Sequence, residues 1–146
     1  MKIGPALAAV AGAASLLLLP AAPAAAHSLD GKDPYRTGCA DSKLYTGKSA
    51  TLRNELGEPL GVLKLYYSTS CGTNWGEVWV SKRATGTITV SRKGKSVSFT
   101  FKAGNGGHHW GDMVHAKRIC AWAKATVRDG IGRVNHASGI TGRACR

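Results

Sequence analysis

The sequence is poor in acidic residues and lacks the motifs that identify many small hydrolases and metalloproteins. Eight Asp and Glu residues stand against 20 Lys and Arg residues in a chain of 146. No H-E-x-x-H or G-x-S-x-G segment occurs, which excludes the zinc-protease helix and the nucleophile elbow of α/β-hydrolases. No two cysteines have the C-x2-4-C spacing of a zinc knuckle. After residue 26 there is no apolar run long enough to cross a membrane.

The first 26 residues have the pattern of a secretory signal peptide. Lys2 supplies a positive charge, an apolar run covers residues 3–19, and three alanines precede position 27 as in an A-x-A cleavage site. Pro20 and Pro23 interrupt the end of the run, which argues against a membrane-spanning helix. We therefore predict cleavage after Ala26, secretion, and a single extracellular domain over residues 27–146 without a transmembrane segment.

All four cysteines lie beyond the predicted signal peptide, at Cys39, Cys71, Cys120 and Cys145. An even number of cysteines in a short exported chain indicates disulfides rather than free thiols. The count alone permits three pairings. Pairing in chain order, Cys39 with Cys71 and Cys120 with Cys145, would staple one end of the domain and then the other. Each bridge would contribute on the order of 3–4 kcal/mol by restricting the unfolded chain.

Alternating apolar and polar residues predict an all-β fold. Residues 61–68 form the clearest strand, and residues 75–81 place Trp75, Glu77 and Trp79 on one face with Val78 on the other. Residues 85–91 and 96–102 predict a hairpin with a cationic tip, whose second strand turns Val97, Phe99 and Phe101 inward. Weaker candidates are residues 49–54, 113–117 and 119–126, whereas residues 128–146 show no assignable pattern. We predict a small single-domain sandwich or partly open barrel of about six to eight short strands, stapled by disulfides.

The histidines suggest chemistry without specifying it. His108, Asp112 and His115 would share one face of a helix, but neighbouring glycines disfavour a helix there. In an extended chain the three residues would spread over roughly 20 Å, so we assign no metal ligand and no cofactor. A small secreted hydrolase such as a nuclease, using His109, His115 or His136, is the alternative function. No spacing identifies these residues as a set, and we assign no catalytic residue.

The positive charge favours a non-enzymatic binding module. The formal net charge is +12, and loss of Lys2 with the signal peptide leaves +11. Such a surplus attracts anionic extracellular surfaces or polymers, such as cell wall or polysaccharide, although it also serves solubility alone. The charge does not indicate any specific nucleic acid as a partner. The candidate binding surface combines an aromatic ring with cations predicted to lie at neighbouring loop ends: Trp79, Lys82, Arg83, Arg92, Lys93 and Lys95.

Three segments and a late pair of cysteines carry a resemblance to a known family. The segments are residues 30–41 (DGKDPYRTGCAD), 63–75 (LKLYYSTSCGTNW) and 110–114 (WGDMV), and the cysteines are Cys120 and Cys145. Together they resemble a group of small secreted Gram-positive proteins known as domain of unknown function 2690. The resemblance covers roughly residues 30–120. It implies an exported one-domain protein without an established activity, and it favours the pairing of Cys39 with Cys71. The chain departs from the family pattern at Leu29, where members often have a further cysteine, and at His115, where they tend to have an aromatic residue.

Overall fold

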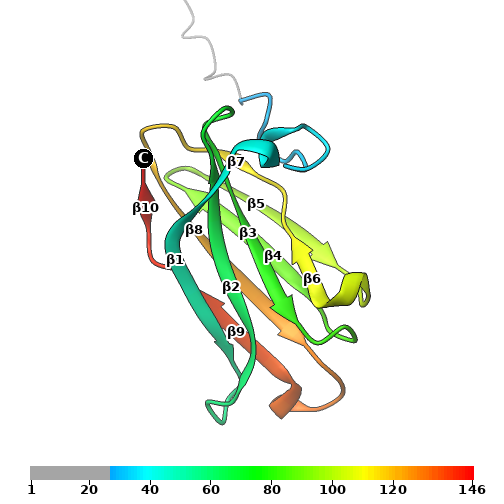
Figure 1. The fold of residues 1–146 in the computed structure, drawn as a ribbon. Helices are drawn as coiled ribbons and strands as arrows, with labels where there is room; N and C mark the ends of the chain where they lie inside the picture. The colour runs from blue at the N-terminus through cyan, green and yellow to red at the C-terminus, as the bar shows by residue number, and fades with distance from the viewer. Residues whose placement is uncertain (1–26) are drawn as a thin grey trace, which may run out of the picture.

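A computed structural model describes residues 27–146, which form ten β-strands and three short 3-10 segments and contain no α-helix (Figure 1). The predicted signal peptide, residues 1–26, lies outside the described residues. The strands are β1 Lys43–Arg53, β2 Pro59–Ser68, β3 Thr73–Val80, β4 Thr85–Arg92, β5 Lys95–Phe101, β6 His108–Trp110, β7 Val114–His115, β8 Cys120–Arg128, β9 His136–Ile140 and β10 Ala144–Cys145. The 3-10 segments are η1 Cys39–Ser42, η2 Asn105–Gly107 and η3 Arg133–Asn135. Within residues 27–146, no helical segment has the length and hydrophobicity needed to cross a bilayer. The all-β prediction is confirmed.

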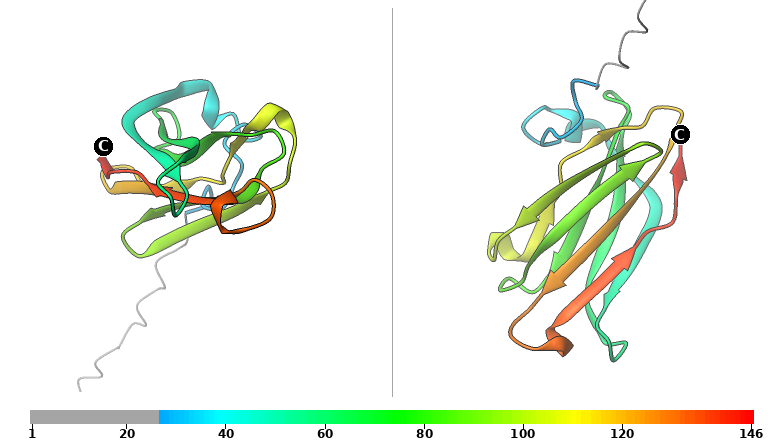
Figure 2. Two further views of the ribbon diagram at one scale, coloured as in Figure 1. Left: turned by 90° about the horizontal axis from the view of Figure 1, so that it is seen from below. Right: turned by 180° about the vertical axis from the view of Figure 1, so that it is seen from behind.

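The strands form one antiparallel sheet that curls into a nearly closed, barrel-like shape. Eight strands follow the order β5-β4-β8-β9-β1-β2-β3-β6, while β10 pairs with β8 and β7 pairs with β3. Figure 2 shows the sheet curving around a central axis. The end strands of this path, β5 and β6, approach each other without pairing, and the rings of Phe101 and His109 stack between them at 4.3 Å. The structure therefore confirms the partly open barrel, and we call the gap between β5 and β6 the seam.

The side chains on the inward face of each strand fill the interior of the barrel, which we call the bore. Leu63, Leu65 and Val78 are completely buried and pack with Ile88 in one apolar cluster. Burial of each such side chain stabilises the fold by about 1.5–3 kcal/mol. Small residues on other strands leave room for them: a Cβ atom at Gly76 would lie only 2.9 Å from the Cγ2 atom of Ile88. The bore is therefore narrow and occupied by side chains.

Both disulfides join cysteines in chain order, as the sequence favoured. Cys39–Cys71 ties η1 to the turn after β2, and Cys120–Cys145 ties β8 to β10. Cys39 packs with Trp75 in a second, smaller apolar cluster outside the bore. This cluster attaches the N-terminal segment to one end of the barrel, where Figure 1 shows it in blue and cyan above the strands.

One predicted strand had the wrong bounds, and the tail, for which no strand was predicted, contains two strands. The unassigned tail contains β9 and β10, and the strand predicted over residues 113–117 is reduced to Val114–His115, with β6 before it. Phe99 does face inward beside its partner Ile88, but it remains 40% exposed. The reason is that β5 is an edge strand, and the seam leaves its inward face without a covering neighbour.

Candidate functional site

Four neighbouring strands present aromatic and lysine side chains on the outer wall of the barrel. Side chains that are directly opposite in paired strands share a face, so the register decides which of them meet. It aligns Tyr45 with Tyr66, Lys64 with Glu77, and Trp79 with His108. Glu77 also aligns with Trp110. We call the resulting surface the aromatic–lysine strip; it consists of Tyr35, Lys43, Tyr45, Lys64, Tyr66, Trp79, His108 and Trp110.

The rings of the strip form a continuous chain of contacts. Trp79 and His108 stack with their centroids 4.7 Å apart and their planes 11° from parallel. Tyr66 lies 6.4 Å from Trp79 on one side, and Trp110 lies 5.7 Å from His108 on the other. Trp79 is 36% exposed and Tyr45 is 46% exposed, so the surface is accessible to a ligand.

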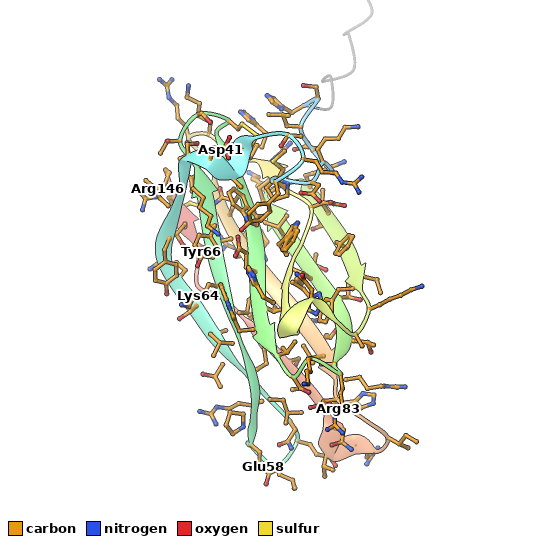
Figure 3. All side chains as sticks on the ribbon, turned by 45° about the vertical axis from the view of Figure 1, so that its right-hand side comes forward. Asp41, Glu58, Lys64, Tyr66, Arg83 and Arg146 are labelled. Carbon is orange, nitrogen blue, oxygen red and sulfur yellow. A yellow bond between two sulfur atoms is a disulfide. The ribbon has the colours of Figure 1, made fainter. Side chains whose placement is uncertain are left out.

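Two lysines hold their ammonium groups over these rings. The Lys43 Nζ lies 4.8 Å from the centre of Tyr66 and 5.2 Å from that of Tyr35. The Lys64 Nζ lies 5.0 Å from the centre of Trp79 and 5.5 Å from that of Tyr45. Each ammonium is attracted to the negative face of both rings, which orients a side chain that would otherwise be flexible. Figure 3 shows Lys64 and Tyr66 close together on the wall.

A fully buried carboxylate lies beneath the strip. The Oε1 atom of Glu77 accepts hydrogen bonds from the Tyr35 hydroxyl at 2.8 Å, the Trp75 Nε1 at 2.9 Å and the Lys43 Nζ at 3.1 Å. Its Oε2 atom lies 2.8 Å from the Nε2 of His108. Burial alone would raise the pKa of Glu77, but the hydrogen bonds from Trp75, His108, Tyr35 and Lys43 outweigh it and hold the pKa below its usual value.

The charge of Glu77 fixes the protonation of its neighbours. Because the carboxylate is ionised and can only accept, the Nε2 atom of His108 must carry a proton and donate. Burial would lower the pKa of Lys43, but its hydrogen bonds to Tyr35 and Glu77 and the charge of Glu77 raise it. The hydrogen bonds of Glu77 therefore hold the Lys43 ammonium and the rings of Tyr35 and His108 in fixed positions at the surface.

The structure separates the cations that the sequence placed at neighbouring loop ends. Lys82 and Arg83 lie in the loop before β4, whereas Arg92 ends β4 and Lys93 and Lys95 follow it. Strand β4 has eight residues, and at about 3.3 Å per residue it puts the cations before it roughly 26 Å from those after it. Arg83 lies 3.6 Å from Asp129, and Arg92 lies 3.4 Å from Asp30. Figure 3 shows Arg83 near Glu58 at the end of the molecule far from Asp41. Of the predicted surface, Trp79 alone belongs to the strip.

The histidines considered for catalysis are also separated. His109 faces inward and stacks on Phe101, His115 stacks on His27 with the centroids 3.6 Å apart, and His136 begins β9. Within residues 27–146, no three His, Cys, Asp or Glu side chains are grouped so as to hold a metal ion. His109, His115 and His136 therefore do not meet in one place as the catalytic residues of a hydrolase would.

Sequence reasoning missed several members of the strip. Tyr35 lies outside every predicted strand, and the weak strand predicted over residues 49–54 began after Lys43 and Tyr45. The signal in the sequence was the lone Lys64 between apolar residues on the best-predicted strand, two residues before Tyr66. What it could not supply was the register, which brings β1 and β6 against β2 and β3.

Comparison with the sequences of known proteins places the chain in a family. The chain is 34% identical over 91 residues to an uncharacterized protein, YjfA, of Bacillus subtilis, a match covering 58% of this chain and 57% of that protein. The chain thus spans little more than half the length of this curated relative. No solved structure matches the chain significantly. The family model described as "Protein of unknown function (DUF2690)" matches residues 27–123, which is well over half of the chain, and the protein therefore belongs to this family.

Proposed function

We propose that the protein is a non-enzymatic binding module for an anionic extracellular polymer, such as a cell-wall polysaccharide, and that the aromatic–lysine strip is its contact surface. The observation that carries the proposal is Lys64, whose ammonium is held over the rings of Trp79 and Tyr45 on an open wall. It has no carboxylate partner among residues 27–146, whereas Lys43 is already paired with Glu77. An ammonium in this position can pair with a carboxylate or phosphate, while the rings pack against the apolar face of a sugar.

The shape of the strip suits an extended chain more than a compact ligand. It crosses four neighbouring strands, β1, β2, β3 and β6, which at about 4.8 Å per strand gives a face roughly 15 Å wide. The face is open wall, so a polymer can run across it and leave at either side. Repeated weak contacts along one chain would then add to the affinity.

An extracellular location belongs to the same proposal. We propose that residues 1–26 are removed and that residues 27–146 form the mature, secreted domain. The two disulfides are compatible with an oxidising environment. The net charge, with its large excess of Lys and Arg, supports an anionic partner because it raises the local concentration of polyanions around the protein.

The proposal is tested by two variants that remove the same charge at different places. Lys64→Ala removes a cation from the strip, and Lys93→Ala removes one from the exposed β4–β5 turn. Binding to immobilised polygalacturonate, with neutral dextran as the control matrix, is measured by retention on a column at increasing salt. We expect Lys64→Ala to weaken binding about tenfold and Lys93→Ala less than about twofold, since a tenfold change corresponds to about 1.4 kcal/mol.

Three results would contradict the proposal. Equal losses for the two variants would mean that total charge, and not the strip, determines binding. Retention that is unchanged above about 0.5 M salt would exclude the electrostatic contribution, because screening is then nearly complete within a few ångströms. Absence of binding to polygalacturonate, polyphosphate and purified cell wall would exclude the polymer class as a whole.

A further inference from the structure

The seam between β5 and β6 contains a hollow that shares only Trp110 with the strip. Its volume is about 430 Å³, within the range of small-molecule pockets. Its lining includes Asp33, Phe99, Phe101, Lys102, His109 and Trp110. The hollow exists because the edge strands of the sheet do not pair, which leaves the inward-facing Phe99 exposed beside the buried stack of Phe101 and His109.

The walls of the hollow are aromatic and held in place. Phe101 and His109 stack face to face, with their planes 17° from parallel. Trp110 donates a hydrogen bond from its Nε1 to the Oδ1 of Asp33 at 3.3 Å, and its ring packs 4.5 Å from that of Tyr35. The exposed Phe99 completes the apolar lining. Such rings can cover the C–H face of a ligand ring without rearranging.

Polar groups accompany these rings. The Nε2 atom of His109 is buried and has no hydrogen-bond partner among residues 27–146. Asp33 accepts its hydrogen bonds from Tyr35, Arg36 and Trp110 on a single oxygen, Oδ1, so its Oδ2 is free to accept from a ligand hydroxyl. Lys102 adds an ammonium donor. Asp33 and Lys102 therefore bring one acidic and one basic side chain to a mostly aromatic lining.

The lining of the hollow holds one carboxylate and one lysine, so it carries no net positive charge to attract an anion. Asp33 lines it, and Asp112 is close enough to Asp33 that its pKa is raised, first by burial and then by the negative charge of Asp33. Burial, followed by the charge of His108, lowers the pKa of His109, which favours its neutral form. The ligand chemistry that fits is neutral, ring-shaped and rich in hydroxyl groups.

We infer that the hollow binds one neutral six-membered sugar ring of the polymer that lies on the strip. This inference rests on the proposed function, and it adds a specificity site to an electrostatic surface. Trp110 connects the two regions, since it lines the hollow and lies 5.7 Å from His108 on the strip. The strip attracts anionic groups, and the hollow distinguishes a polysaccharide from a polyphosphate or a nucleic acid.

The experiment follows the four tryptophan indole N–H signals of the full secreted protein by NMR. Glucose, N-acetylglucosamine and inorganic phosphate are titrated separately, and each signal is assigned from a Trp→Phe variant. We expect at least one of the two sugars to shift the Trp110 signal saturably at millimolar concentration and phosphate to leave it in place. Phe99→Ala, an exposed edge position, should weaken sugar binding at least about fivefold, by about 1 kcal/mol. Ser98→Ala, on the opposite face of β5, is the matched control.

A second variant tests the imidazole. His109→Phe keeps a ring against Phe101 and removes only a buried nitrogen, so we expect it to change sugar affinity less than about twofold. Failure of both sugars to shift Trp110, or an unchanged affinity in Phe99→Ala, would overturn the inference. A phosphate-induced shift of equal size would also overturn it.

The polymer experiment separates this failure from that of the proposed function. Salt-sensitive polygalacturonate retention that depends on Lys64 would leave the strip proposal standing without the hollow. Sugar binding without any polymer retention would overturn the strip proposal and support a separate sugar site.

Discussion

The aromatic–lysine strip and the tip of the β4–β5 hairpin both place cations beside a buried carboxylate, yet they differ in what surrounds the charge. In the strip, Glu77 gathers four hydrogen-bonding partners, and the Lys43 ammonium that it binds also lies over two rings. At the tip, Asp30 pairs with Arg92 and accepts a hydrogen bond from the backbone N–H of His115 at 2.6 Å. That carboxylate attaches the N-terminal segment to the barrel, whereas Glu77 organises an exposed surface.

The difference shows that a count of cations says little about where a ligand would bind. The tip has the denser run of cations in the sequence, with Arg92, Lys93 and Lys95 within four residues. The strip has fewer, but each is held at a fixed position by rings on neighbouring strands. Preorganised groups lose less conformational freedom when they bind, so they contribute more per charge.

The largest expected effect is at the centre of the strip. Glu77→Ala should lower the free energy of unfolding by about 3 kcal/mol, because it leaves Trp75, Tyr35 and Lys43 without their acceptor. Urea unfolding measures the change. Glu55→Ala, in the exposed turn after β1, is the control and should remain within about 0.5 kcal/mol of the parent. Similar losses of unfolding free energy in Glu77→Ala and Glu55→Ala would mean that the buried hydrogen-bond network of Glu77 adds no more stability than an exposed carboxylate.

A smaller loss is expected at the tip. Asp30→Ala removes the partner of Arg92 and one acceptor for a backbone N–H, and it should cost about 2 kcal/mol in the same urea experiment. It should leave polygalacturonate binding nearly unchanged, since Asp30 does not contact the strip. A loss of binding as large as that of Lys64→Ala would contradict the separation of the two regions.

Next in size is the contribution of one ring on the strip. Trp79→Ala should weaken polygalacturonate binding about tenfold, or about 1.4 kcal/mol, because it removes both the exposed ring and the support for Lys64. Trp122→Ala is a matched control, since Trp122 also lies under a cation, Arg143, but on β8. Column retention should change less than about twofold for Trp122→Ala. Equal losses of retention in the two variants would indicate that any aromatic–cation pair on the wall can bind the polymer, and would contradict a specific role of the strip.

The smallest effect concerns acid stability at the seam. Burial lowers the pKa of His109 in the folded state, so its stabilising contribution is present above the unfolded value of about 6.5 and is lost as the pH falls towards the folded value. His109→Phe should therefore flatten the decline of stability as the pH falls below about 6.5, as measured by urea unfolding across the acidic range. His115, whose pKa is lowered by burial and then by His27, keeps part of the slope. A steeper curve in the variant would contradict this sign.

The fold could be read from the sequence wherever one strand alternates clearly. In β3, the alternation placed Trp75, Glu77 and Trp79 on one face, and the structure confirms that they share the outer wall. It failed in the tail, because β9 and β10 are short and gain their stability from pairing with β8. Such strands have little pattern of their own, and non-local pairing decides whether they form.

The candidate site was less accessible to sequence reasoning than the fold. Tyr45, Lys64 and His108 are far apart in the chain, and only the register of three strand pairs brings them together. The same limitation explains why cations on β3–β4 and β4–β5 loops were placed side by side. An eight-residue strand separates those loops, and two loops at successive ends of one antiparallel strand lie at opposite ends of a sheet.

The narrow bore has a consequence for how specificity can change in such a protein. Barrels of about eight strands can enclose a small ligand when their interior is wide enough. Here Gly76, Ala123 and Ala125 admit the larger side chains of facing strands, so the interior is fully committed to stability. The outer wall is the part whose residues can be exchanged without repacking the centre, whereas Phe101 at the seam belongs to the core cluster. The architecture thus separates the residues under selection for folding from those free to adapt to a new ligand.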